Sequence, residues 1–255
     1  MTTSEIMTIV ISFHMSRHRD FKNYYLGYVS LIYKSEFPNL LCYTRFLAVM
    51  PRVIVPMCAY FTSHKGQPTG VEFIDSTSIK VCHNIRIPRY KTFDGIAQLG
   101  KGTMGWFYGF KLYLVVNHHG EIVAAKVTTG NVHDTQPVRE LASCLMDKLY
   151  GDKGYLSKAL EADLLDKGVK LITTVRKNMK AKAMSLWDRA MLSKRFIIET
   201  INDQLKNISF IEHSRHRSMN GFMLNLVAGL VAYCFKENKP HLNLTDVELN
   251  ALVIA

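Results

Sequence analysis

Three acidic residues that are far apart in the chain have sequence surroundings that suit a site for divalent cations. They are Asp75 in Phe-Ile-Asp-Ser-Thr, Asp152 in Tyr-Gly-Asp-Lys-Gly-Tyr and Glu199 in Phe-Ile-Ile-Glu-Thr. Cleavage and joining of phosphodiester bonds use two cations about 4 Å apart, one at the attacking oxygen and one at the leaving oxygen. Hard cations take oxygen ligands, so a protein must cluster carboxylates around them. These residues can support that chemistry only if the fold brings them together.

Two of the three residues also have ordinary structural explanations. Asp75 lies in an apolar, β-branched segment, where a carboxylate is costly to bury unless it is paired or bound to a metal. A salt-bridged or capping aspartate at the end of a strand is the alternative. The glycines beside Asp152 would let a ligand and the backbone approach closely, but they are equally expected in a turn. Neither residue is decisive by itself.

Glu199 belongs to a more informative pattern. Arg195, Glu199 and Lys206 fall near one face of a helix, because steps of 4, 7 and 11 residues approximate whole turns. Another face is apolar and would dock on a sheet, through Ile197, Ile201, Leu205 and Ile208. The polar face would then present its carboxylate toward the cations. The alternative is an amphipathic helix with a weakly stabilising Arg–Glu pair.

The segments around these residues predict alternating strands and helices. Strands are expected at 71–81, 106–117, 121–128, 148–155 and 171–175. Helices are expected at 135–145, 157–167 and 187–208, and residues 82–105 are expected to form a loop. Three antiparallel strands followed by alternating helices and strands predict an α/β fold with a mixed sheet flanked by helices. This order is similar to that of the ribonuclease H-like fold.

The first part of the chain has a different pattern. Residues 2–61 are predicted to be helical, with Thr2 and Glu5 in capping-box spacing, and to be broken into short helices by prolines 38, 51 and 56. The polar stretch 62–70 marks a boundary. We therefore expect a small helical N-terminal region at 1–65, a catalytic domain at 66–240 and a C-terminal tail at 241–255. The apolar run 221–235 is short for a membrane crossing and predicts a buried helix.

Composition and charge narrow the class of protein. The chain has 255 residues, 48% of them hydrophobic, which is enough for a sizeable core and argues against disorder. The net charge is +11, and residues 167–217 alone carry +8. Such a surface suits a polyanion such as DNA or RNA, although a basic protein without that partner remains the alternative. Five unpaired cysteines argue against a disulfide framework and a structural zinc site.

Taken together, these segments resemble the DDE transposases of bacterial insertion sequences, in the group with a Y-x2-R-x3-E-x6-K signature. Arg195, Glu199 and Lys206 fit that spacing, whereas Leu192 stands at the tyrosine position. The segment Gly-Asn-Val-His-Asp at 130–134 and the surroundings of the two aspartates also look like motifs of this family. The resemblance runs from about residue 71 to 233 and is less distinct in the N-terminal region.

The resemblance implies a ribonuclease H-like catalytic domain. Asp75 and Asp152 would together ligate two Mg²⁺ ions, with Mn²⁺ as a substitute, and Glu199 would complete the shell of one ion. The enzyme would cut at the ends of an insertion sequence, and the freed 3′-hydroxyl would attack target DNA. Arg195 and Lys206 would hold phosphates, a role for which a guanidinium fork and an ammonium point charge are well suited.

Several further residues and partners follow as expectations. Arg215 and Arg217 would form part of a basic, DNA-facing loop. Asp134 would either support the metal ligands or cap the following helix, and the cap is favoured. Trp106 would stack on a base or, more commonly, lie in the core. Asp203, one turn after Glu199, is left outside the site.

The expected partners are double-stranded DNA, both terminal repeats and target, and a second copy of the chain on that DNA. No membrane is expected, and the location would be cytoplasmic and associated with the nucleoid. The N-terminal region would help to recognise the terminal repeats. Two alternatives remain open: a ribonuclease H-like nuclease without strand transfer, and a catalytically inactive DNA-binding descendant of a transposase.

Overall fold

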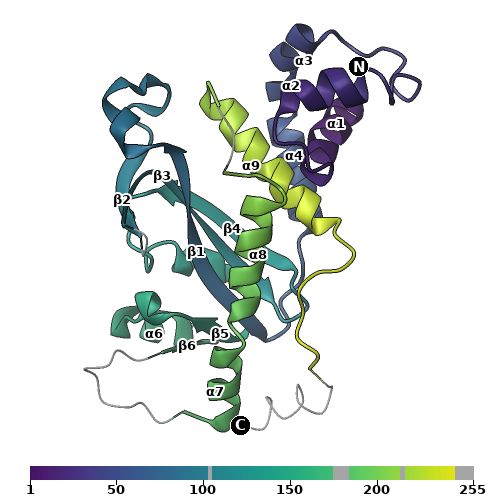
Figure 1. The fold of residues 1–255 in the computed structure, drawn as a ribbon. Coiled ribbons are helices and arrows are strands. Elements are labelled where there is room, and N and C mark those ends of the chain that lie inside the picture. Colours follow the sequence, from purple (N-terminus) through teal and green to yellow (C-terminus); the bar gives the residue numbers. More distant parts are fainter. Residues whose placement is uncertain (103–104, 175–183, 213–215, 245–255) are drawn as a thin grey trace.

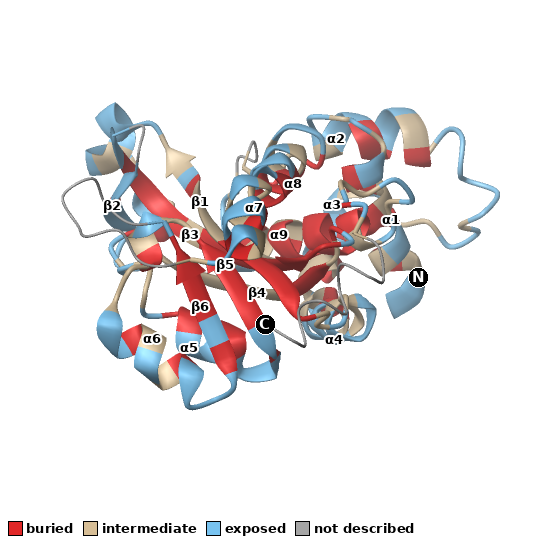
Figure 2. Cartoon of the chain, turned by 90° about the horizontal axis from the view of Figure 1, so that it is seen from below, coloured by how far each residue is buried: buried red, intermediate tan, exposed pale blue. Residues whose placement is uncertain are grey.

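A mixed sheet forms the centre of the molecule, with helices on both faces and a cluster of N-terminal helices beside it (Figure 1). The computed structural model describes residues 1–102, 105–174, 184–212 and 216–244. Buried residues concentrate in the strands and on the sides of the helices that face them (Figure 2). The architecture confirms the predicted α/β class.

The sheet has six strands in the order β2-β3-β1-β5-β6, and β4 also pairs with β3. Their bounds are β1 Val71–Cys82, β2 Gln98–Gly102, β3 Gly105–Asn117, β4 Ile122–Thr129, β5 Asp147–Gly151 and β6 Val169–Thr173. β3 is antiparallel to β1, β2 and β4, whereas β5 is parallel to β1 and to β6. A mixed sheet in this order is compatible with the predicted ribonuclease H-like fold.

The prediction of a loop over residues 82–105 is wrong. This stretch contains two 3₁₀ helices, Asn84–Arg89 and Lys91–Phe93, and the strand β2. The β2 sequence, Gln-Leu-Gly-Lys-Gly, has no β-branched residue. It is a strand because its backbone pairs with β3 from Gln98↔Gly109 to Gly102↔Gly105. Local sequence carries no signal for such a pairing, since β-propensity reflects packing against neighbours more than the backbone itself.

The two faces of the sheet are covered by different helices. One face packs on α5 (Val138–Leu141) and α6 (Lys158–Leu165), and the other on α8 (Phe196–Asn207) and α9 (Met219–Cys234). Neighbouring residues of β1 face opposite ways, as strand geometry requires, with Phe73 toward α8 and Ile74 toward α5. The helix predicted at 135–145 is shorter in the structure. It consists of α5 and continues only as the 3₁₀ turn Ala142–Cys144.

The helix predicted over 187–208 is two helices, α7 (Leu186–Ser193) and α8. Arg195 lies at the junction and is the N-terminal capping position of α8. The buried face of α8 consists of Ile197, Ile198, Ile201, Asn202 and Leu205. Ile208, predicted to belong to that face, lies beyond the end of the helix and is 41% exposed. The buried face of α8 therefore includes one polar residue, Asn202, which lies next to the sheet.

α9 joins the two parts of the molecule. One side of it packs with the sheet through Phe222, Leu226, Leu230 and Tyr233. The other side packs with the N-terminal helices through Leu224, Val227, Ala228, Val231 and Ala232. A helix that is apolar all round has to be buried on all sides. The prediction of a buried helix here is confirmed.

The N-terminal region consists of short helices that pack on α9. α1 (Thr3–Met15) has the predicted capping box, in which the Thr2 hydroxyl and the Glu5 carboxylate exchange hydrogen bonds with each other's backbone N–H. It is followed by α2 (Phe21–Tyr24), which continues as a π-helix to Val29, and by α3 (Tyr43–Val49) and α4 (Ile54–His64).

Of the three predicted proline breaks, the one at Pro51 coincides with the change from α3 to a 3₁₀ helix, whereas Pro56 does not break α4. Pro51 lies in the first turn of the 3₁₀ helix Met50–Val53 and Pro56 in the first turn of α4, where no intrahelical N–H is needed. The helical run Tyr43–His64 is therefore continuous, with a mean hydropathy of 1.4, and by length and composition alone it could cross a membrane. Instead, Phe46, Val53 and Met57 pack in the core shared with α1 and α9.

Candidate active site

Asp75 lies between the sheet and α8. It is on the same face of β1 as Phe73, two residues earlier, and pairs with Leu114 of β3. The Nδ2 of Asn202 on α8 donates a hydrogen bond to Asp75 Oδ2 at 3.1 Å. The carboxylate is thus held at the one polar position of an otherwise apolar helix–sheet contact.

Asp152 follows the strand that lies beside β1. β1 and β5 are parallel, and the last pair in their register is Phe73↔Tyr150. The chain remains extended at Asp152, so this residue lies opposite Asp75 and on the same face. Neighbouring strands are about 4.8 Å apart. Asp152 Oδ1 accepts a hydrogen bond of 2.6 Å from the backbone N–H of Gly154, which fixes the carboxylate at the start of a 3₁₀ turn.

Glu199 approaches the same place from α8. It lies three residues before Asn202 and therefore on a neighbouring position of the same helical face. Its side chain is 57% exposed and accepts a hydrogen bond from Arg195 Nη2 at 3.1 Å. An exposed pair of this kind is weak, so Glu199 can exchange that partner for another cation at little cost.

The pKa of Asp75 responds to the charged groups around it. The pKa of Asp75 is raised from 3.8 to about 6, chiefly by burial, and the negative charges of Asp152 and Glu199 contribute to this rise. A hydrogen bond from the backbone of Ser76 and the positive charge of Arg195 act in the opposite direction. The structure therefore brings together three of the predicted acidic residues and one of the predicted cations.

Asp134 does not cap a helix, so the favoured interpretation of this residue is wrong. The capping position of α5 is Pro137, which has no side-chain hydrogen bond. Asp134 Oδ1 instead accepts hydrogen bonds from Lys111 Nζ and Tyr113 Oη, both at 2.9 Å. A Cβ placed on Gly154 would lie 2.8 Å from Asp152 Oδ1 and 3.6 Å from Asp134 Oδ2. The two carboxylates thus face a common space at the edge of the site.

The remaining predicted cations lie farther away. Lys206 Nζ is 3.1 Å from Glu212 Oε2, in an ion pair at the C-terminal end of α8. Arg217 is at the start of α9, where it lines a large cavity. Arg215 falls outside the described residues. Trp106, expected in the core, is 60% exposed at the start of β3.

Sequence reasoning missed three residues of the site. Asn202 could have been found, because it lies three residues after Glu199 on the same helical face. Tyr155 is buried, which raises its pKa well above its ordinary value, and the charges of Asp75 and Asp134 add to that effect. Lys111 meets Asp134 only through the pairing of strands, so no local pattern points to it.

The donor set suits a hard cation. Within the described ranges, no three His, Cys, Asp or Glu side chains lie close enough together to hold a metal ion as they stand. Each acidic side chain instead accepts a hydrogen bond within the protein: Asp75 from Asn202, Asp152 from Gly154 and Glu199 from Arg195. All three groups offer oxygen, and the negative charges of Asp152 and Glu199 add to the effect of burial in raising the pKa of Asp75. A divalent cation between them would relieve that repulsion.

Comparison with known families agrees with this geometry. Residues 65–219 match the family model described as a transposase DDE domain. The chain belongs to this family. The match covers more than half of the chain and includes the whole sheet, α8 and all three acidic residues. No curated protein matches the chain.

Proposed function

We propose that this transposase cuts DNA at the ends of an insertion sequence and joins the freed 3′-hydroxyl to target DNA, in reactions that depend on divalent cations. The observation that carries the proposal is that Asp152, next to β5, and Glu199, on α8, both act electrostatically on the buried Asp75 of β1. The family match supports a transposase. The oxygen-only donor set supports metal-assisted phosphoryl transfer.

Asp75 and Asp152 would hold two Mg²⁺ ions, or Mn²⁺ as a substitute, and Glu199 would complete the shell of one ion. When bound, such a pair activates the attacking oxygen and stabilises the leaving oxygen. Asn202 orients the Asp75 carboxylate through the hydrogen bond to Oδ2. Asp134, held by Lys111, would support the site from its edge near Gly154.

Arg195 has a second role in this proposal. In the absence of DNA its guanidinium pairs with Glu199 and lowers the pKa of Asp75. If Glu199 held a metal ion, Arg195 would be released to bind a phosphate of the DNA with its planar fork. Lys206 would take a more distant phosphate after release from Glu212.

We further propose that the N-terminal region at residues 1–65 helps to recognise the terminal repeats and that two copies of the chain assemble on double-stranded DNA. The net charge of +11 supports a DNA partner. A cytoplasmic, nucleoid-associated enzyme is consistent with these roles.

Cleavage of DNA that contains the ends of the element, by purified protein with Mg²⁺, tests the proposal. Asp75→Ala, Asp152→Ala and Glu199→Ala are expected to abolish cutting while DNA binding is retained. Asp203→Ala is the matched control, because Asp203 is on the same helix as Glu199 but pairs with Asn207. Full activity of any of the three alanine variants would remove that residue from the site.

A second substrate separates the two alternatives. A supercoiled plasmid supplied as target should become covalently joined to the cut ends. Cutting without joining would indicate a nuclease, and binding without cutting in either Mg²⁺ or Mn²⁺ would indicate an inactive descendant.

A further inference from the structure

The amide of Asn202 makes its hydrogen bond to a proposed metal ligand from inside an apolar contact. Asn202 is only 6% exposed, and the rest of the buried face of α8 consists of Ile197, Ile198, Ile201 and Leu205. Its Nδ2 donates to Asp75 Oδ2 at 3.1 Å. Its Oδ1 is buried and has no hydrogen-bond partner among the described residues.

Packing alone does not explain an asparagine at this position. A buried oxygen without a donor costs free energy, whereas a leucine would continue the apolar face and leave no polar atom unpaired. The amide cannot gain by turning over, because Oδ1 would then face the carboxylate oxygen of Asp75. The carboxylate that Asn202 holds therefore accounts for its presence on this face.

The other two acidic residues differ in how firmly they are held. Asp152 Oδ1 is fixed by the hydrogen bond of 2.6 Å from the backbone N–H of Gly154. Glu199 is 57% exposed, and its pair with Arg195 is of the weak, exposed kind. The site thus has two carboxylates in fixed orientations and one that can adapt.

Divalent cations differ in how well they tolerate fixed ligands. Mg²⁺ requires a nearly ideal octahedron with oxygens at about 2.1 Å. Ca²⁺ is larger and accepts about six to eight oxygens at about 2.3–2.6 Å in a flexible arrangement. The choice between the two ions therefore depends on whether the ligands can move apart to admit the larger one.

We propose that Asn202 is a positioning residue that makes the site select Mg²⁺ over Ca²⁺, by holding the Asp75 carboxylate in one orientation. This inference rests on the proposed metal-dependent function and deepens it by assigning the choice of ion to a residue that would not itself bind the ion. Hydrogen-bond partners of metal ligands commonly change metal affinity by about 10–100-fold when they are replaced.

The test measures metal binding by the full chain in the absence of DNA. A ligand that binds the folded chain raises the midpoint of thermal denaturation, so titrations with MgCl₂ and with CaCl₂ at constant ionic strength give a Kd for each ion. Stabilisation that remains in Asp75→Ala is due to binding elsewhere and is subtracted. Both ions require the ionised carboxylate, so any change in the ionisation of Asp75 cancels in the ratio of the two Kd values.

Two variants remove the amide and leave different side-chain volumes. In Asn202→Leu, the Kd for Mg²⁺ should rise much more than the Kd for Ca²⁺, so that the preference for Mg²⁺ falls on the order of tenfold. Asn202→Ala should lower the preference to a similar extent. Agreement between the two variants would assign the change to the lost donor, because their packing differs.

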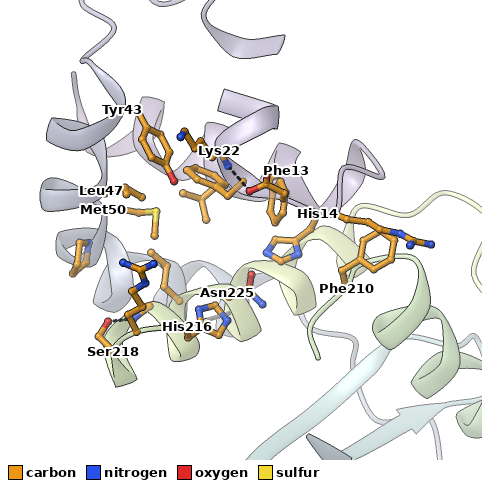
Figure 3. A pocket seen from close by; sticks show the side chains of 18 of the residues that line it. Phe13, His14, Lys22, Tyr43, Leu47, Met50, Phe210, His216, Ser218 and Asn225 are labelled. Atoms are coloured by element: carbon orange, nitrogen blue, oxygen red, sulfur yellow. Dashed lines mark hydrogen bonds between the residues drawn. The ribbon is translucent and has the colours of Figure 1, made fainter. Parts of the chain in front are cut away.

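Asn207→Leu is the matched control, since it removes an amide from the same helix. Asn207 donates to Asp203 at 2.6 Å and lines a large cavity beside the N-terminal helices (Figure 3). That cavity carries aromatic rings and the cations Arg19, Lys22 and Arg217, and none of the three proposed metal ligands lines it. The control should keep the preference of the wild-type chain.

The outcomes separate this inference from the proposed function. An unchanged preference in both Asn202 variants would overturn the inference, and so would a wild-type chain that binds Ca²⁺ more tightly than Mg²⁺. Either result would leave the cleavage assay free to support the proposed function. A wild-type chain that neither ion stabilises beyond the level of Asp75→Ala would count against both.

Discussion

Replacement of Asp75 by asparagine should stabilise the metal-free protein in a pH-dependent way. The amide is close to the carboxylate in shape, and its oxygen can still accept the hydrogen bond from Asn202. The substitution removes a carboxyl group that can be charged. Burial, together with two neighbouring carboxylates, raises the pKa of that group from 3.8 to about 6. The folded wild-type chain therefore binds a proton more tightly at this position than the unfolded chain does.

The expected gain in the free energy of unfolding follows from the difference between the pKa of Asp75 in the folded chain and in the unfolded chain. A rise from 3.8 to about 6 corresponds to about 3 kcal/mol, and the part of the side chain that remains in contact with solvent reduces this to about 1–3 kcal/mol. The stability that wild-type Asp75 contributes when protonated is present below about pH 4 and is lost as pH rises through about 6. The asparagine variant has no charge to lose there.

Urea denaturation of both proteins at pH 4 and pH 8, in EDTA, measures this effect. We expect nearly equal free energies of unfolding at pH 4 and an advantage of about 1–3 kcal/mol for Asp75→Asn at pH 8. Mg²⁺ at ten times its Kd should then stabilise the wild-type chain at pH 8 by about 1.4 kcal/mol and have a smaller effect on the variant. An advantage that does not change with pH would refute the reasoning about this site.

Three further predictions concern neighbouring parts of the molecule. Arg195→Ala should raise the pKa of Asp75, because its charge lowers it, and a pH–rate profile of cleavage should show the acidic limb displaced to higher pH. Lys148→Met should cost about 1–3 kcal/mol of stability in urea denaturation, since it removes the nearer cation of Asp188, a residue only 4% exposed, and leaves Lys170 at 4.0 Å. Leu224→Ala, in the fully buried contact between α9 and the N-terminal helices, should cost about 2–5 kcal/mol. Calorimetry should still show one transition if those helices and the sheet unfold together, and two transitions would contradict the shared core.

Most of the sheet could be predicted because its long strands have their own patterns. β1, β3 and β4 alternate or are rich in β-branched residues, and the predicted ranges lie within a few residues of those observed. β2 could not be predicted, because it is a strand only through its partner. The break between α7 and α8 was also missed, since the helical pattern continues across Arg195.

In the candidate site, too, some features could be predicted from the sequence and others could not. Motif spacing was enough to select Asp75, Asp152 and Glu199, because each lies in a recognisable segment. The ion pairs of Asp134 with Lys111 and of Lys206 with Glu212 were not predictable, since they depend on which side chains meet after folding. The cavity lined by His14 and His216 is built from segments about 200 residues apart, so no local pattern indicates it.

By itself, then, the sequence determined which residue types were available for chemistry and the order of the elements that carry them, because hydrophobic periodicity and motif spacing are local properties. Only the tertiary structure decided that Asp152 lies opposite Asp75, that Asn202 holds it, and that a positively charged, aromatic cavity lies at the far end of α8. Those features arise from strand register and from the packing of α9 between two cores, which are properties of the folded chain as a whole.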